Sequence, residues 1–159
     1  MAKKILDRFF QIILNILLVL VFLVLGFAMY SYVMLNMFHK DYVNVFGYTF
    51  FEVASGSMGE AIHISDMVIV KINSSYDVGD VITYYNDGDF ITHRVVSIDN
   101  DKIICRGDAN TSNDNPINNS VVLGRVVYVF KNVGIWKKIL MTPKVFISMV
   151  ITLFLFSFT

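Results

Sequence analysis

The sequence is poor in cysteine and in charge, and each shortage excludes a class of protein. Its 159 residues include one cysteine, Cys105, so an intrachain disulfide framework and a cysteine-based zinc or iron–sulfur site are excluded. Thirteen basic and thirteen acidic residues give a formal net charge of zero, which supplies no cationic field for nucleic acid. With 55% hydrophobic and 16% charged residues, the chain carries more apolar surface than a soluble domain of this size can bury.

The longest apolar run lies near the N-terminus. Residues 9–38 contain no charged residue, and about 20 helical residues are enough to cross a hydrocarbon core of roughly 30 Å. The run is too long for the apolar part of a cleaved signal peptide, which spans about 7 to 15 residues. It therefore predicts an uncleaved transmembrane anchor. The preceding basic end, residues 1–8, contains Lys3, Lys4 and Arg8 and predicts a cytoplasmic N-terminus.

A second apolar segment occupies residues 139–159. It reaches a marginal spanning length if Lys144 extends its amine to the membrane surface. The alternative is a helix lying in the interface, because Trp136, Lys137 and Lys138 precede the segment. We expect a second membrane segment here, with the working domain, residues 39–138, on the extracytoplasmic side.

Residues 39–138 have the pattern of a β domain. Tight turns at 86–89 and 99–100 predict hairpins between consecutive strands. The expected fold class is mostly β, an antiparallel sheet or partly closed barrel, with the N-terminal transmembrane helix and a second one at 139–159. The polar stretch 107–120 is predicted to be an irregular loop of functional length. The predicted strands are the runs rich in β-branched and aromatic residues at 48–54, 67–72, 81–85, 90–98, 102–106 and 121–130.

A serine and a histidine are the first candidates for chemistry. Ser57, in the run Ser55-Gly56-Ser57-Met58, follows a predicted strand and has the exposure that a nucleophile needs. Serine and glycine are also ordinary turn residues, so this motif alone is weak. His93 lies within a predicted strand and shares a face with apolar neighbours. It is either a hydrogen-bonded core histidine or the base that a nucleophilic serine requires.

Two carboxylates in the polar loop are further candidates. Asp108 and Asp114 lie six residues apart, and either could hold the imidazole of a catalytic triad in its working tautomer. The alternative is that both stabilise turns, as Asp often does in such loops. The scattered aspartates and the strand histidine show no metal-ligand spacing, so no metal site is expected.

The chain resembles signal peptidase I in the combination and order of its motifs. These are the anchor, S-G-S-M at 55–58, T-H-R at 92–94 within a predicted strand, and G-D-A-N at 107–110 followed by Asp114. The resemblance is to its endoplasmic-reticulum-type branch, which uses serine and histidine and occurs in eukaryotes, archaea and some Gram-positive bacteria. It covers about Val53 to Val129. It implies that Ser57 is the nucleophile, His93 the general base, Asp114 the triad carboxylate and Asp108 a second required acid. It also implies an oxyanion hole formed by the Ser57 amide and the Ser55 hydroxyl.

Two positions depart from the pattern of that family. Glu60 stands three residues after the nucleophile, where proline is common, and Ser65 precedes Asp66 where glycine is usual. Without proline, the backbone of this loop has more conformational freedom. Neither change replaces a nucleophile, base or carboxylate.

The resemblance implies a membrane-bound serine endopeptidase that removes signal peptides from exported proteins without a cofactor. Its partners would be signal-peptide-bearing preproteins and the lipid bilayer, and no nucleic acid. It would lie in the plasma membrane, or in the endoplasmic reticulum membrane of a eukaryote, and would act alone or within a multi-subunit peptidase complex. The alternative function is a non-catalytic, membrane-anchored β domain that binds secreted proteins.

Overall fold

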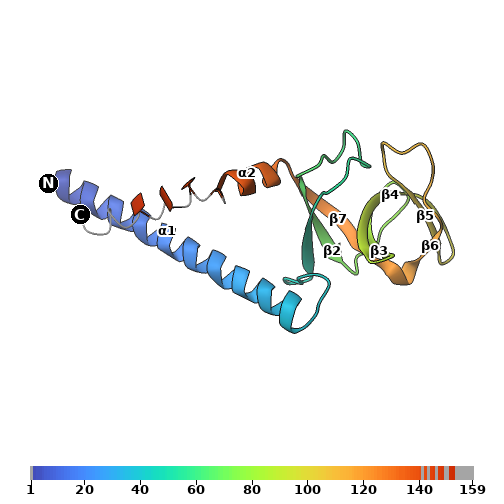
Figure 1. Cartoon of the computed structure of the whole chain (residues 1–159), viewed down its shortest axis with the longest axis horizontal. Coiled ribbons are helices and arrows are strands. Elements are labelled where there is room, and N and C mark those ends of the chain that lie inside the picture. The colour runs from blue at the N-terminus through green and yellow to red at the C-terminus, as the bar shows by residue number, and fades with distance from the viewer. Residues whose placement is uncertain (1, 141, 143, 146, 149–150, 153–159) are drawn as a thin grey trace. The chain divides into compact units, whose positions relative to one another are not determined.

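The computed structural model describes residues 2–140, 142, 144–145, 147–148 and 151–152. Its backbone divides into two units, Met1–Val43 and Asn44–Thr159. The first unit consists mainly of the long helix α1, Ala2–Tyr32, which continues as a short π-helix, Val33–Met37 (Figure 1).

One helix among the described residues, Arg8–Met37, is long and apolar enough to cross a membrane by length and composition. It coincides with the anchor expected at 9–38, because a run rich in leucine and without proline has nothing to interrupt its helical hydrogen bonds. A short helix, α2, spans Val133–Leu140. The second membrane segment expected at 139–159 falls largely outside the described residues.

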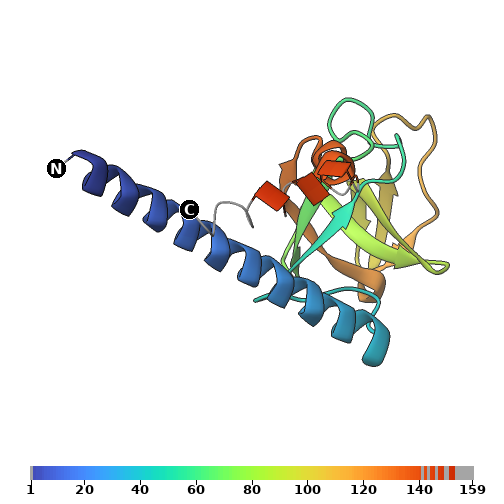
Figure 2. The ribbon, with the colours of Figure 1, turned by 60° about the vertical axis from the view of Figure 1, so that its left-hand side comes forward.

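The second unit contains one sheet in which every pair of neighbouring strands is antiparallel. The strand order is β1-β2-β7-β3-β4-β5-β6, and Figure 2 shows that the sheet curls. It is nevertheless not closed: in the described part of the chain, no ladder joins β1 to β6. The predicted antiparallel sheet is confirmed, and the expectation of partial closure is corrected. The strands are β1 Tyr48–Glu52, β2 Met67–Ile72, β3 Val81–Asn86, β4 Asp89–Asp99, β5 Lys102–Arg106, β6 Ile117–Asn118 and β7 Val122–Phe130.

The two predicted hairpins are confirmed, with turns that suit their sequences. Asp87 and Gly88 both have positive φ, 49° and 98°, as the two-residue turn between β3 and β4 requires. Asn100 has φ 52° in the turn between β4 and β5. The turn between β3 and β4 fixes the register that places Ile82 of β3 opposite His93 of β4.

The prediction that residues 107–120 form an irregular loop was wrong for the C-terminal part of that segment. β6 pairs with β5 there, and a 3-10 turn, Asn119–Val121, follows it. Ile117 packs against the core, yet a single apolar residue among asparagine and serine gives no alternation from which a strand could be predicted.

The buried apolar residues form two clusters that support different parts of the candidate site. The first cluster joins β3, β4 and β5 and contains Ile82, Tyr84, Val95, Ile103 and Cys105. The second packs the loop after β1 against β2 and contains Met58, Ile62, Val68 and Val70. One cluster therefore supports the strand that carries His93, and the other supports the loop that carries Ser57.

Candidate active site

Ser57 lies in the loop of residues 53–66, which joins β1 to β2 and is held at several points. At its base, the Val53 amide donates to the Asp66 carbonyl at 2.8 Å, and the Ser65 amide donates to the Val53 carbonyl at 2.9 Å. The side chain of Met58, next to Ser57, is 2% exposed and packs in the core. These contacts fix Ser57 although its loop has no regular structure.

A buried carboxylate, Asp66, ties the same loop to the end of β7. Its oxygens accept hydrogen bonds from the His63 amide at 2.9 Å and the Asn132 amide at 2.8 Å, and the Lys131 ammonium lies 3.1 Å away. Burial alone would raise the pKa of Asp66, but these donors and the nearby charge outweigh burial and lower it. Asp66 therefore stays ionised and holds the loop. The preceding residue, Ser65, adopts φ 71°, a conformation that favours glycine.

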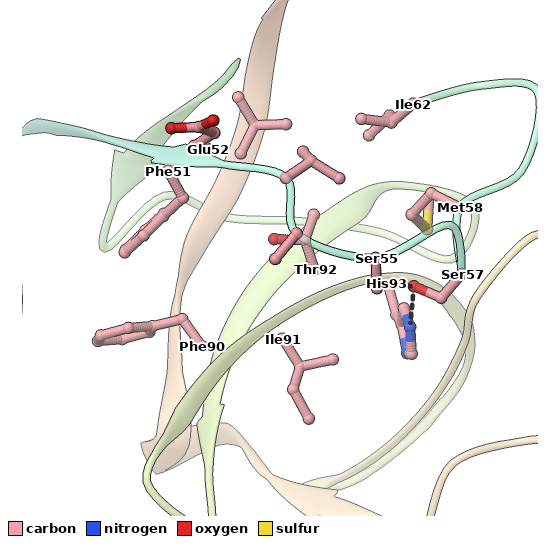
Figure 3. Close-up of a pocket in the computed structure, with 13 residues that line it drawn as sticks. Phe51, Glu52, Ser55, Ser57, Met58, Ile62, Phe90, Ile91, Thr92 and His93 are labelled. Atoms are coloured by element: carbon pink, nitrogen blue, oxygen red, sulfur yellow. Dashed lines mark hydrogen bonds between the residues drawn. The ribbon is translucent and has the colours of Figure 1, made fainter. Parts of the chain in front are cut away.

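His93 contacts both other members of the proposed triad. It is 7% exposed and shares a buried face of β4 with Val95, as the alternation predicts. Its Nε2 lies 3.0 Å from the Ser57 Oγ (Figure 3). Its Nδ1 lies 2.6 Å from the Asp114 Oδ2. A hydrogen-bonded line thus runs from the serine through the imidazole to a carboxylate.

Asp114 is positioned by the first core cluster. Its amide donates to the Cys105 carbonyl at 2.8 Å, and the Tyr84 hydroxyl donates to its Oδ2 at 3.0 Å. Burial, followed by the hydrogen bond to Asp114, raises the pKa of the Tyr84 phenol well above its usual range. Burial beside the same carboxylate raises the pKa of the Cys105 thiol to about 12. Both groups therefore remain neutral, and the tyrosine remains a hydrogen-bond donor.

Asp108 binds the arginine that follows the histidine instead of the histidine itself. The Arg94 guanidinium donates to both Asp108 oxygens, from Nε at 2.9 Å and from a terminal nitrogen at 2.6 Å. Its other terminal nitrogen donates to the Gly79 carbonyl at 2.8 Å. The hydrogen bond from Arg94 lowers the pKa of the Asp108 carboxyl more than partial burial raises it. Of the two candidate carboxylates, Asp114 contacts the imidazole, whereas Asp108 binds Arg94 and so holds its own loop against β4.

The loop that carries Asp108 also touches Ser57. The Ala109 amide donates to the Ser57 carbonyl at 2.8 Å. A Cβ on Gly107 would lie 2.5 Å from that carbonyl oxygen and 3.0 Å from the His93 Nε2, so this position requires glycine. The loop packs directly against both the serine and the imidazole.

A cavity of about 330 Å³ opens beside the serine. The Ser55 Oγ lies 3.2 Å from the Ser57 Oγ at one end of the cavity, and Figure 3 shows Phe51 and Phe90 at the other end. The two phenylalanine rings are 4.8 Å apart between centroids. The wall combines the segment after β1 with the first half of β4. The remaining lining residues are Glu52, Val53, Ala54, Met58, Ile62, Val68, Ile91, Thr92 and His93.

From the sequence alone, neither Tyr84 nor Arg94 was assigned a role in the site, yet each donates a hydrogen bond to a candidate carboxylate. Tyr84 could have been found from the hairpin, because the turn at Asp87 and Gly88 pairs Tyr84 with Ile91 and so sets it diagonally from His93 on the same face. Arg94 gave no comparable signal, since alternation directs it to the opposite face from His93. The described residues hold no group of three histidine, cysteine or acidic side chains placed to bind a metal ion.

No protein-family model matches the chain, and no curated protein matches it. We therefore infer the function from the arrangement of the residues described above.

Proposed function

We propose that this protein is a membrane-anchored serine endopeptidase of the signal peptidase I type, in the branch that uses serine and histidine. One observation carries the proposal: Ser57, His93 and Asp114 form a continuous hydrogen-bonded line beside a cavity. The three residues come from three separate segments of the chain, so their convergence is not a consequence of sequence proximity. Such an arrangement is recognised by geometry and roles, independently of fold.

The distances support a conventional acyl-transfer sequence. With the Nδ1 proton donated to Asp114, the free Nε2 of His93 accepts the Ser57 hydroxyl proton as Oγ attacks the scissile carbonyl carbon. His93 then gives that proton to the departing amine when the carbon–nitrogen bond breaks. Water, deprotonated by the same imidazole, releases the acyl group and restores the Ser57 hydroxyl.

The developing oxyanion has two proposed donors. These are the backbone amide of Ser57 and the hydroxyl of Ser55, which is 3.2 Å from the nucleophilic oxygen. Donors already aimed at the reacting carbonyl stabilise charge that appears only in the transition state. Ser55 lines the same cavity as Ser57, as this role requires (Figure 3).

The substrate is proposed to lie extended between the segment 53–57 and the start of β4. The pairing of β5 with β4 begins at Arg94, so the residues of β4 before His93 are left to line the cavity. An extended peptide can bind beside a strand through main-chain hydrogen bonds while its alternate side chains enter pockets. We propose small side chains at the first and third residues before the cut, as the family resemblance implies.

The membrane helix explains why such an enzyme would be anchored. The apolar core of a signal peptide lies in the bilayer, so its cleavage site is presented close to the membrane surface. The helix Arg8–Met37 would keep the β domain there, with the basic end in the cytoplasm and Ser57 on the extracytoplasmic face. The substrates are then preproteins arriving at the plasma membrane, or at the endoplasmic reticulum membrane in a eukaryote.

An acylation experiment separates this proposal from a β domain that only binds secreted proteins. Purified protein in detergent is mixed with an activated peptide ester ending in alanine, quenched with acid and analysed by intact mass and peptide mapping. We expect one acyl group on Ser57 in the wild type and none in Ser57→Ala. His93→Ala should lose most of the adduct because the general base is missing. A folded wild-type protein that gains no acyl group at Ser57 would favour the binding module.

A further inference from the structure

We infer that Tyr84 is a positioning residue whose hydroxyl controls how Asp114 holds His93. The inference rests on the proposed function for its consequence in catalysis, but its physical basis is a set of contacts that exists without substrate. Tyr84 lies outside the reacting groups and acts through the carboxylate. The proposed line of three residues thereby becomes a line of four.

Both donors reach the same carboxylate oxygen. Asp114 Oδ2 accepts from the Tyr84 hydroxyl at 3.0 Å and faces the His93 Nδ1 at 2.6 Å. A carboxylate oxygen can accept two hydrogen bonds, and each donor withdraws some of the negative charge available to the other. The tyrosine hydroxyl therefore fixes the rotation of the carboxylate and moderates its attraction for the imidazole.

Tyr84 is itself held firmly. Its side chain is 2% exposed and packs in the cluster that includes Cys105 and Val95. Its phenol stays protonated, because burial and the adjacent carboxylate raise its pKa far above neutrality. Buried tyrosine hydroxyls usually need a partner, and here that partner is the proposed catalytic carboxylate.

Other titratable groups lie around His93 and Asp114, but Asp114 is the main charged group next to the imidazole. Cys105, from β5, is a neutral thiol, with a pKa raised to about 12 by burial and by Asp114. Asp108 is nearby and ionised, but Arg94 of β4 binds both its oxygens. Arg106, at the end of β5, acts on Asp108 in the same direction as Arg94. A change in the hydrogen bonds to Asp114 is therefore felt chiefly by His93.

The decisive test is Tyr84→Phe, compared with Tyr85→Phe as the matched control. Tyr85 is the next residue and is 41% exposed, so the control removes a hydroxyl from the same strand without touching Asp114. With one donor gone, the bond from Nδ1 to Oδ2 strengthens. We expect the NMR signal of the His93 Nδ1 proton to move downfield in Tyr84→Phe and to stay in place in Tyr85→Phe.

In the peptidase assay, Tyr84→Phe should lower kcat about tenfold with little change in KM, because the Asp114 carboxylate is no longer held in one rotation. This loss is the size of one lost hydrogen bond to a charged group. A purely structural role does not predict the shift of the Nδ1 proton. An unmoved Nδ1 proton in folded Tyr84→Phe would overturn the inference, whatever the assay shows.

A second substitution keeps the inference testable if Tyr84→Phe does not fold. 3-Fluorotyrosine at position 84 keeps the hydroxyl but makes it a stronger donor, so the Nδ1 proton should move upfield, opposite to the change in Tyr84→Phe. No shift, or a downfield shift, would contradict the inference. These NMR measurements need no turnover. They therefore decide the role of Tyr84 even if the acylation experiment shows that the protein is not a peptidase.

Discussion

Replacing Asp114 by asparagine is expected to lower kcat for peptide cleavage by about 10⁴-fold, the cost of losing the carboxylate in a serine–histidine–aspartate triad. Asp114 Oδ2 lies 2.6 Å from the His93 Nδ1 and fixes the proton on that nitrogen. An asparagine amide can donate to Nδ1 instead, which would put the imidazole proton on Nε2, facing Ser57. The base would then be blocked where it must accept a proton. Steady-state kinetics on a fluorogenic peptide at several pH values measures the effect.

Asp108→Asn is the matched comparison, and its expected loss is far smaller, roughly tenfold, the scale of one hydrogen bond to a charged group. Asp108 binds Arg94 and secures the loop, without a direct bond to the imidazole in the part of the structure described. Because the two residues act as a pair, the double variant Asp108→Asn/Arg94→Gln should lose little more than the single one. Equal losses in Asp114→Asn and Asp108→Asn would contradict the roles assigned to the two carboxylates.

Gly107→Ala is expected to lower kcat/KM by about 10²-fold or more, because displacing a catalytic group by about 1 Å costs that much. The added Cβ would lie 2.5 Å from the Ser57 carbonyl oxygen and 3.0 Å from the His93 Nε2. Neither neighbour can give way without altering the distance between serine and base. The loss should appear in peptide cleavage and equally in acylation of Ser57, since acylation requires the same proton transfer.

Gly56→Ala, in the serine loop, controls for the substitution itself. A Cβ at Gly56 meets nothing within 4 Å, so this variant should lose far less activity than Gly107→Ala. Circular dichroism and thermal unfolding of both variants separate a local displacement from loss of the fold. Cleavage of the peptide by folded Gly107→Ala as fast as by the wild type would contradict the role assigned to Gly107.

The sheet was largely predictable because its signals are local. The alternation in β4 and the turn residues at Asp87 and Gly88 depend on sequence neighbours alone, and both strands of that hairpin appear where expected. Closure of the sheet was not predictable in this way. It depends on whether the two edge strands reach each other, and among the described residues the two-residue β6 pairs with β5 alone.

The candidate residues were predictable as a set, whereas their contacts were not. Spacing along the chain does not tell which of Asp108 and Asp114 reaches His93, because both lie in one loop at similar sequence separation. The choice is made by long-range contacts: the Asp114 amide binds the Cys105 carbonyl, and Arg94 captures Asp108. Tertiary packing, which no local pattern encodes, also brings Tyr84 to the carboxylate.

The departure from the family pattern at Glu60 has a local structural setting. The preceding Gly59 adopts φ 55°, and its amide donates to the Gly56 carbonyl at 3.0 Å, which closes a turn around Ser57. Glu60 itself is exposed. The turn that presents the serine is therefore formed by glycine geometry and hydrogen bonding, without the φ restriction that proline would impose.

The most direct test of the central claim is cleavage of a preprotein. The full-length protein in detergent is incubated with a preprotein that carries a signal peptide, and the new N-terminus of the product is sequenced. We predict a single cut that follows a small residue at the end of the signal peptide, made by the wild type and not by folded Ser57→Ala. An intact preprotein with the wild type, or the same cut with Ser57→Ala, would contradict the claim that Ser57 is the nucleophile of a signal-peptide-cleaving enzyme.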